Sequence, residues 1–262
     1  MARCPSKVLS SIIVTPSRHY QNAPIIEALI DIRAQLPVES HLEMLQEVFA
    51  KVKQEYPKKV TRDYVQGHLS LGDEVGISAK QTPMGFVCYS KDGTQVFQAR
   101  LDGFTFSRLK PYENWFQLRD EAKRLWDIYS SVMKPVRINR VALRYINQID
   151  IPLPMKDFKD YLRTTPEISP DLPQGLSGFF MQLQIPQDDF GGLLMLTQTI
   201  VPPRNPSVVS VILDIDVFKT DADLSLESDV WSLLEVLRSR KNDFFEGCIT
   251  NQCRALFGPW SD

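Results

Sequence analysis

Two stretches of alternating apolar and polar residues constrain the fold of this chain more than any other feature. The first follows Pro24 and extends to Gln35, and the second occupies residues 140–151. A period of two is typical of a β-strand that packs one face on a core and keeps the other face polar. The apolar members are Ile26, Ala28, Ile30, Ile32 and Ala34 in the first stretch, and Val141, Leu143, Tyr145, Ile149 and Ile151 in the second.

In the first half of the chain, the alternating strand precedes a helix, three strands and a second helix. Ser40 and Glu43 have the spacing of a capping box, and the helical pattern after them ends before Pro57. An Asp92-Gly93 pair has the turn chemistry of a hairpin. The pattern predicts strands at Tyr64–Leu71, Gly85–Ser90 and Gln95–Ser107, and a helix from about Glu113 to Met133.

The second half repeats this order of elements. After its alternating strand we predict a short helix, a Pro-rich loop, three antiparallel strands and a long helix capped by Ser225. The predicted ranges are Met155–Leu162 for the short helix, Phe179–Ile185, Leu193–Val201 and Val208–Phe218 for the strands, and Phe244–Leu256 for a last amphipathic piece.

The repeated order indicates an internal duplication. We therefore predict an α+β fold in which two tandem strand–helix–three-strand–helix units form antiparallel sheet, with the helices packed on one side. The units are residues 20–135 and 136–262, and residues 1–19 are expected to be a poorly ordered leader or an edge strand. Met133–Val136 offers only a tight turn, so one integrated body is favoured over two separate domains.

Composition excludes several classes of protein. The 262 residues are 43% hydrophobic and 24% charged, with a net charge of −2, which excludes a wholly disordered chain and gives no general attraction to nucleic acid or anionic lipid. No apolar run is long enough for a transmembrane helix. The four cysteines form neither a disulfide framework nor a zinc pattern, as expected for reduced thiols in the cytoplasm. We find no phosphate loop, dinucleotide fingerprint or nucleophile elbow, and we predict no metal or cofactor.

Several short motifs resemble a family of uncharacterised bacterial and archaeal proteins that is described as sporadically distributed. The similar segments are Tyr20–Ala28, Asp102–Leu109 with Tyr112 and Trp115, Arg140 with Leu143–Ile149, and Trp231–Phe245 with Ile249, Thr250, Phe257 and Gly258. The resemblance spans nearly the whole chain but implies no particular activity. The patchy occurrence of the family implies horizontal transfer, which is typical of genes in defence, toxin–antitoxin or phage-conflict loci.

The second alternating strand carries the main candidate binding residues. Arg140, Arg144 and Gln148 share its polar face and could bind phosphate, carboxylate or an acidic partner, or could pair across the sheet with Glu27 or Asp31. Asn147 lies on the apolar face, where an amide needs hydrogen-bond partners, so it either stabilises a loop or bulge or contacts a ligand. The candidate partner- or ligand-binding residues are Glu27, Arg140, Arg144, Asn147 and Gln148.

A second set of residues would serve a nucleic-acid surface on the open face of the sheet. Such a surface needs arginines together with aromatic side chains that stack on bases or wedge between them. The candidates are Arg100, Arg140, Arg144, Phe97 and Phe104. A small basic cluster at Arg238, Arg240 and Lys241 is interpreted as the end of a helix, where cations meet the negative end of the dipole.

Three functions are therefore considered. The first is a non-enzymatic interaction protein of a mobile defence or toxin–antitoxin-like system that binds a partner encoded nearby. The alternative is nucleic-acid binding by the open face. A third possibility is a ligand-binding or hydrolytic enzyme, which a deep polar pocket containing Asn147 and an arginine would favour. We expect no membrane association, and the oligomeric state is left open.

Overall fold

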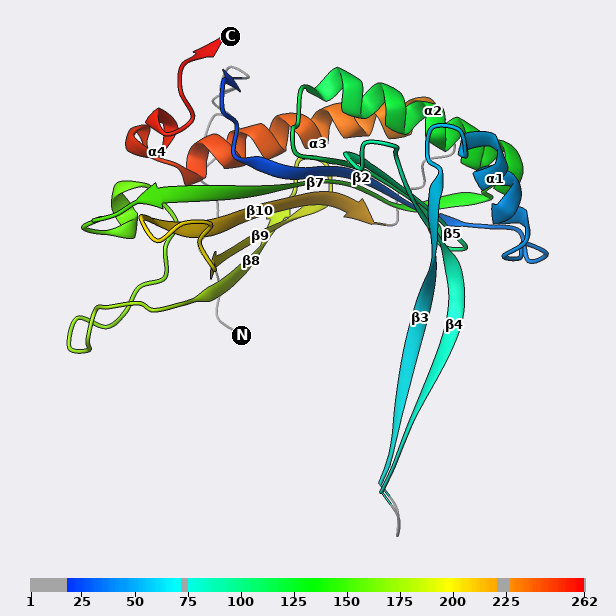
Figure 1. The fold of residues 1–262 in the computed structure, drawn as a ribbon, viewed down its shortest axis with the longest axis horizontal. Helices are drawn as coiled ribbons and strands as arrows, with labels where there is room; N and C mark the ends of the chain where they lie inside the picture. The colour runs from blue at the N-terminus through cyan, green and yellow to red at the C-terminus, as the bar shows by residue number, and fades with distance from the viewer. Residues whose placement is uncertain (1–17, 72–74, 221–226, 262) are drawn as a thin grey trace.

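The computed structural model of the chain describes residues 18–71, 75–220 and 227–261. Over these residues, nine strands form one antiparallel sheet in the order β3-β4-β5-β6-β2-β7-β10-β9-β8, which we call the main sheet (Figure 1). Its strands are β2 (Ile25–Gln35), β3 (Lys58–Leu71), β4 (Val75–Tyr89), β5 (Gln95–Arg100), β6 (Gly103–Leu109), β7 (Arg137–Pro152), β8 (Phe180–Gln187), β9 (Gly192–Val201) and β10 (Val208–Thr220).

The two alternating stretches are confirmed as strands, and they pair with each other at the centre of the main sheet. β2 and β7 run antiparallel, and β6 and β10 flank them on either side. Ile30, Ile32 and Leu143 turn their side chains to one face and are fully buried, whereas Asp31 and Arg140 lie on the other face. The three predicted antiparallel strands of the second half are confirmed as β8, β9 and β10.

The longest helices lie on one side of the main sheet, as predicted (Figure 1). The covered side is called the helix face below, and the other side the open face. Asn114 caps α2 by accepting a hydrogen bond from the Gln117 N–H at 3.0 Å, and Lys134 ends it in a left-handed conformation. The helices are α1 (Met44–Val52), α2 (Trp115–Met133), α3 (Glu227–Cys248) and α4 (Asn251–Ala255), with a 3₁₀ turn at Phe158–Asp160.

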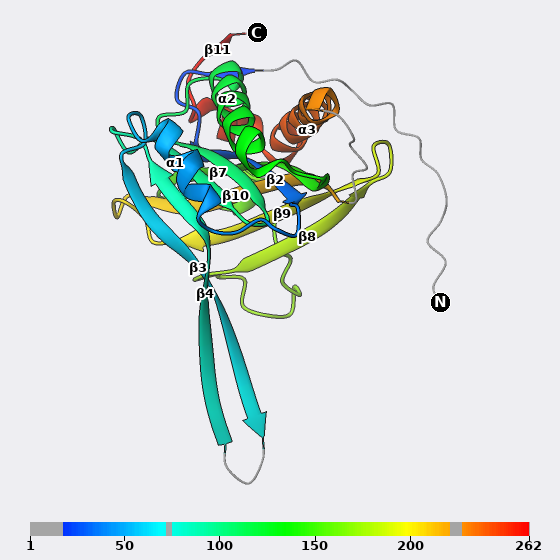
Figure 2. The ribbon, with the colours of Figure 1, turned by 90° about the vertical axis from the view of Figure 1, so that its right-hand side faces the viewer.

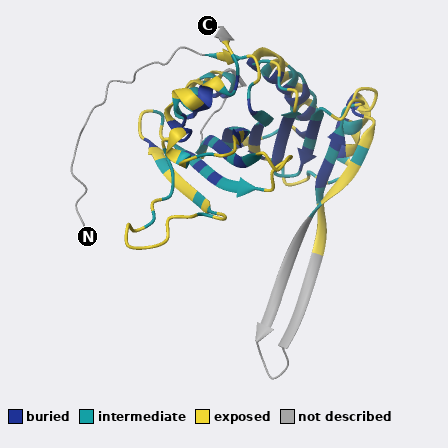
Figure 3. Ribbon diagram, turned by 60° about the vertical axis from the view of Figure 1, so that its left-hand side comes forward, coloured by how far each residue is buried: buried dark blue, intermediate teal, exposed yellow. Residues whose placement is uncertain are grey.

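The core lies between the helix face and the inner sides of the helices (Figure 3). Aromatic side chains fill much of it: Trp126 stacks on Tyr129, and both pack against Phe104 of β6. Fully burying such a side chain contributes about 1.5–3 kcal/mol relative to leaving it exposed. Because this packing needs both the sheet and α2, the helix has one fixed position on the sheet.

A long hairpin formed by β3 and β4 projects away from the body (Figures 1 and 2). Only Gly85–Tyr89 of β4 pairs with β5. Segments 64–71 and 75–82 pair with each other, and neither pairs with another strand of the main sheet. We call these two segments and the residues that join them, 64–82, the arm.

Four local predictions are corrected by the structure. The predicted strand Gln95–Ser107 is two strands, β5 and β6, because residues 101 and 102 form a tight turn. The Ser40–Glu43 capping box does not form: α1 starts at Met44 without a side-chain cap. Only a single 3₁₀ turn occurs within Met155–Leu162, and the predicted piece Phe244–Leu256 is divided between the end of α3 and α4.

Both ends of the described chain meet. β1 (His19–Tyr20) pairs with β11 (Trp260–Ser261) in a separate two-stranded sheet. The predicted leader falls largely on residues 1–17, and the predicted cap Ser225 falls in residues 221–226; both lie outside the described residues. Within the described ranges, no helix is both long and apolar enough to cross a lipid bilayer.

Candidate functional site

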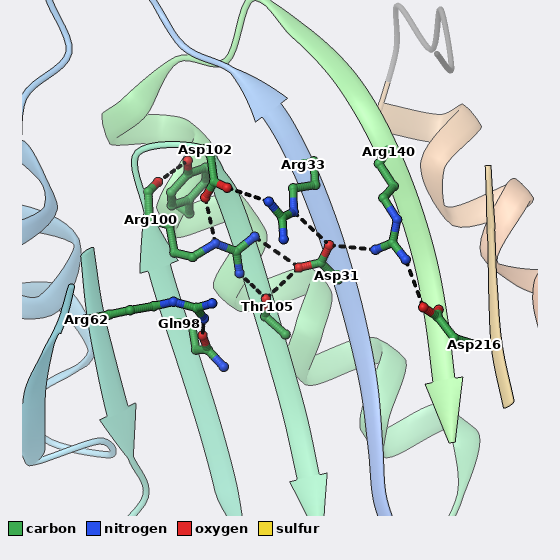
Figure 4. A network of polar contacts seen from close by, with 10 residues as sticks. Asp31, Arg33, Arg62, Gln98, Arg100, Asp102, Thr105, Arg140 and Asp216 are labelled. Atoms are coloured by element: carbon green, nitrogen blue, oxygen red, sulfur yellow. Dashed lines mark hydrogen bonds and ion pairs between the residues drawn. The ribbon is translucent and has the colours of Figure 1, made fainter. Parts of the chain in front are cut away.

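The candidate arginines of the open face take part in a network of ion pairs around Asp31 (Figure 4). One carboxylate oxygen of Asp31 accepts hydrogen bonds from the Thr105 hydroxyl at 2.7 Å and from Arg100 at 3.0 Å. The other accepts from Arg140 at 3.0 Å, and Arg140 also donates to Asp216 at 2.9 Å. The expected cross-strand pair between Arg140 and Asp31 is thus confirmed.

Arg144 and Gln148 are also engaged with neighbours on the open face. The Nε and Nη2 atoms of Arg144 donate to the two carboxylate oxygens of Asp214, at 2.9 and 2.6 Å. This bidentate geometry makes arginine–carboxylate pairs strong. Gln148 donates to Asp150 at 3.0 Å. Glu27 lies half-buried near Arg144, and its side chain has no hydrogen bond or ion pair in the part of the chain that the structure describes. These contacts favour a structural role for this polar face.

The residues considered for nucleic-acid binding do not form one surface. Phe97 and Phe104 are completely buried on the helix face, where their rings pack on each other at 5.5 Å between centroids. Arg140 and Arg144 lie on the open face, and Arg100 is buried in the ion-pair network. The structure therefore separates the aromatic members of this set from the arginines.

Asn147 is the candidate residue that leads to a cavity. It lies on the helix face of β7, and its Nδ2 donates to the Leu213 carbonyl oxygen at 3.0 Å. Its Oδ1 accepts no hydrogen bond from any residue of the described ranges, although the side chain is 98% buried. The residue borders a cavity of about 430 Å³.

Four parts of the chain, distant in sequence, build the cavity. β7 forms its floor with Tyr145 and Asn147, because odd-numbered residues of this strand face the helices. The second half of α3 forms one wall with Arg238, Lys241 and Glu246. The remaining walls are segment 18–25, which leads into β2, and segment 110–115, which leads into α2.

Lys241 is the most unusual group in the cavity. Its ammonium nitrogen lies 3.8 Å from the centre of the Tyr145 ring. Within residues 18–71, 75–220 and 227–261, no carboxylate pairs with it. Burial lowers the pKa of Lys241 to about 7, and the positive charge of Arg238 acts in the same direction, against the weaker opposite effect of Glu246.

Two tyrosines with a shared hydrogen bond line the same cavity as this lysine. The hydroxyl oxygens of Tyr112 and Tyr145 are 2.8 Å apart and share a hydrogen bond. Burial raises the pKa of Tyr112 to about 12 and raises the pKa of Tyr145 as well. Both side chains therefore remain neutral at physiological pH. One hydroxyl donates to the other, which leaves one hydroxyl proton of the pair to donate to another group.

The cavity lining carries more positive than negative charge. Its cations are Arg18, Lys110, Arg238 and Lys241, against the carboxylates Glu113 and Glu246. Both carboxylates are already neutralised. Arg108 pairs with Glu113 at 3.1 Å, and Glu246 accepts from Arg18 at 3.3 Å, from Arg254 at 2.8 Å and from the Tyr20 hydroxyl at 2.7 Å. The site is suited to an anion.

Sequence reasoning found Asn147 but missed Lys241, Tyr112 and Glu246. Lys241 was assigned to a basic cluster at a helix end, whereas α3 continues to Cys248 and places the lysine well inside the helix. No protein-family model matches the chain, and a search of curated proteins finds no match either. The resemblance to the sporadically distributed family therefore stays a prediction. In the described ranges, no three His, Cys, Asp or Glu side chains gather closely enough to hold a metal ion.

Proposed function

We propose that this protein binds a small anionic molecule in the cavity between β7, α3 and the segments that lead into β2 and α2. The observation that carries the proposal is Lys241, a cation held in a cavity without a carboxylate partner among the described residues. A partly buried charge without a counter-charge is unfavourable, and a bound anion would supply that counter-charge. The volume of about 430 Å³ falls in the range of small-molecule sites.

The other cavity residues support the choice of ligand class. Arg238, which also pairs with Glu235 at 3.4 Å, adds a second positively charged side chain, and the Tyr112–Tyr145 hydroxyl pair adds a neutral donor. The Asn147 Oδ1 can accept a hydrogen bond from a hydroxyl or amine of the ligand. The pocket that was expected to favour a ligand-binding function, one that contains Asn147 and an arginine, therefore exists.

Isothermal titration of the full-length protein with inorganic phosphate, acetate and citrate tests this proposal. We expect saturable binding of at least one probe and at least tenfold weaker binding by Lys241→Met, equivalent to about 1.4 kcal/mol. Lys123→Met is the matched control, because Lys123 is exposed on α2. Acetate binding should also strengthen as the pH falls through 7, because Lys241 becomes charged while acetate remains ionised. Equal affinity of Lys241→Met and wild type would contradict the proposal.

A second candidate function is that of an interaction protein of a mobile defence or toxin–antitoxin-like locus, as the sequence suggested. The arm favours it. Segments 64–71 and 75–82 hydrogen-bond as strands only to each other, and an isolated two-stranded hairpin is only marginally stable in water. A projecting hairpin offers two strand edges to which a partner chain could add. The nucleic-acid alternative has less support, because the open-face arginines are already paired.

Replacement of residues 64–82 by a two-residue Asn-Gly turn tests the second candidate. Co-expression with the product of the adjacent gene should give a complex with the intact protein and none with the shortened one. Phosphate binding by the shortened protein serves as the control and should be unchanged, because no cavity residue lies in the arm. A complex that survives removal of the arm would argue against this role.

We also propose that the two halves derive from one duplicated unit. The order of strands supports this. From the central pair outward, β2 is followed by β6, β5 and β4, and β7 is followed by β10, β9 and β8. In each half, the last of these strands in sequence lies next to the first and leads to a long helix on the helix face. The additional strand β3 and the arm would then be an elaboration of the first half.

A further inference from the structure

The cavity holds an arrangement that anion binding alone does not require. Lys241 lies against the face of Tyr145, whose hydroxyl is bonded to that of Tyr112. A lysine that served only to attract an anion would do so best as a permanent cation at the surface. Here the amine lies over the Tyr145 ring, in the lining of a cavity that also contains Arg238 and the Tyr112 hydroxyl. This is the environment of a lysine that reacts through its uncharged amine.

We propose that Lys241 is a nucleophile that forms a reversible imine with the carbonyl carbon of a small carbonyl acid, such as a 2-oxo acid, bound in the cavity. The inference rests on the proposed binding of an anion at the same site. It specifies the ligand as one that carries a carboxylate and an adjacent ketone or aldehyde. Arg238 would attract the carboxylate, while Lys241 reaches the carbonyl carbon.

The reaction balances without any oxidant or reductant. The lone pair of the Lys241 nitrogen forms a bond to the carbonyl carbon, and the electrons of the C=O π bond move to oxygen, which takes up a proton. The nitrogen loses a proton, and the resulting carbinolamine releases its oxygen as water when the C=N bond forms. One amine and one carbonyl compound give one imine and one water. The Tyr112–Tyr145 hydroxyl pair is placed at the cavity wall to donate a hydrogen bond to the developing oxyanion.

The charge state of Lys241 is compatible both with attack by its uncharged amine and with binding of the ligand's carboxylate. Four elements bring titratable groups to the cavity that contains Lys241. They are Tyr145 from β7, Arg238 and Glu246 from α3, Lys110, Tyr112 and Glu113 from the segment before α2, and Arg18, His19 and Tyr20 from the segment before β2. The tyrosines stay neutral, and Glu246 is held by Arg18 and Arg254. Because burial lowers the pKa of Lys241 to about 7, a large fraction of the amine is uncharged at neutral pH. A protonated imine restores the positive charge beside the bound carboxylate.

The test is reductive trapping in the full-length protein. We would incubate it with pyruvate and sodium cyanoborohydride, and map the reduced adduct by peptide mass spectrometry. The adduct is expected on Lys241 and to form on the order of a hundredfold faster at pH 7.5 than on exposed Lys123, because an ordinary lysine with a pKa of about 10.4 is almost fully charged there. The pH profile of labelling at Lys241 should have its midpoint near 7.

Two variants and a second ligand separate this inference from the binding proposal. Lys241→Arg cannot form an imine and should give no adduct at position 241, and titration of the wild-type protein with L-lactate and phosphate measures anion binding separately. Lys123→Arg should be labelled at Lys241 as in wild type. Adducts spread evenly over surface lysines would overturn the inference.

The comparison of Lys241 with Lys123 within the wild-type protein holds even if a variant fails to fold. Binding of lactate and phosphate without an adduct from pyruvate would overturn imine formation and leave the binding proposal standing. If the wild-type protein bound none of L-lactate, phosphate and pyruvate, both imine formation and the proposed anion binding would be overturned.

Discussion

Asp31 and Asp216 belong to the same ion-pair network, but their pKa values are shifted in opposite directions. Burial alone would raise the pKa of Asp31, but Arg100, the Thr105 hydroxyl and Arg140 outweigh it and hold that pKa below its ordinary value. For Asp216, burial together with the charges of Asp214 and Asp31 outweighs Arg140 and Arg144, and the pKa is raised. One oxygen of Asp216 is buried without a hydrogen-bond partner in the described part of the chain. Asp31 is thus the centre of the network.

This difference predicts unequal losses of stability in two matched variants. Asp31→Asn should destabilise the protein by about 3 kcal/mol at pH 7, because it leaves Arg100 and Arg140 facing an amide. Asp216→Asn should cost less than about 1 kcal/mol, since it removes a charge whose burial is poorly compensated. Urea unfolding at pH 7 measures both. Equal losses would contradict this account of the network.

The contributions of Asp31 and Asp216 to the stability of the fold depend on pH with opposite sign. A carboxyl whose folded-state pKa is depressed stabilises the fold above its unfolded pKa, and that contribution is lost as the pH falls through the folded pKa. Asp31 belongs to this class, so the deficit of Asp31→Asn should shrink when the measurement is repeated at about pH 3. Asp216, with its raised pKa, contributes below its unfolded pKa and loses that contribution as the pH rises through the folded value.

At the same scale, individual residues show how far the sequence could predict the site. Asn147 could be found because an amide on an apolar strand face breaks a clear pattern. Lys241 breaks no pattern: it follows two arginines and resembles a solvated helix end. Its environment depends on Tyr145 and on segment 110–115, which come from other parts of the chain. The surroundings of Lys241 are set by tertiary packing, so they cannot be predicted from the residues next to it in the sequence.

At the scale of elements, the turn between β5 and β6 shows why one strand was predicted where two exist. Phe97 and Ala99 face the helices, and so do Phe104 and Phe106, so the buried positions change from odd to even numbers between them. A single strand cannot make that change, because its side chains alternate with a period of two. This change in parity is present in the sequence, but the prediction of a single strand over Gln95–Ser107 did not use it. The uninterrupted patterns of β2 and β7 contained no such change, and their positions were predicted well.

The same turn predicts a strict requirement for glycine at position 103. Gly103 has a φ of +140°, and a Cβ there would lie 2.2 Å from the Ile32 carbonyl oxygen of β2. Gly103→Ala should therefore destabilise the protein by at least about 3 kcal/mol, through backbone strain and separation of β6 from β2. Gly175→Ala is the control, because a Cβ there would meet nothing within 4 Å. Similar thermal unfolding of both variants would show that the turn tolerates a side chain.

At the scale of the whole molecule, the two halves are joined as closely as neighbouring strands of a single domain. The β2–β7 pairing crosses the predicted boundary near residue 135 along most of the length of β2. Asp31 pairs with Arg140 on the open face, and the Trp115 indole N–H donates to Glu235 of α3 at 2.8 Å on the helix face. Tyr20, at the start of the described chain, reaches Glu246 near the end of α3.

These contacts predict that the halves fold only together. A fragment of residues 1–135 would expose one edge of β2, and a fragment of residues 136–262 would expose the matching edge of β7, each with an uncovered row of backbone hydrogen-bonding groups. Expressed alone, each fragment should lack a cooperative thermal transition by circular dichroism.

Co-expressed, the two fragments should co-purify through a tag on one of them and regain a cooperative transition, because the central strand pair can form between chains. Arg140→Ala and Asp31→Ala should weaken that association, whereas Lys123→Ala, at an exposed position of α2, should leave it unchanged. A cooperative transition in either fragment alone would instead establish two independent domains.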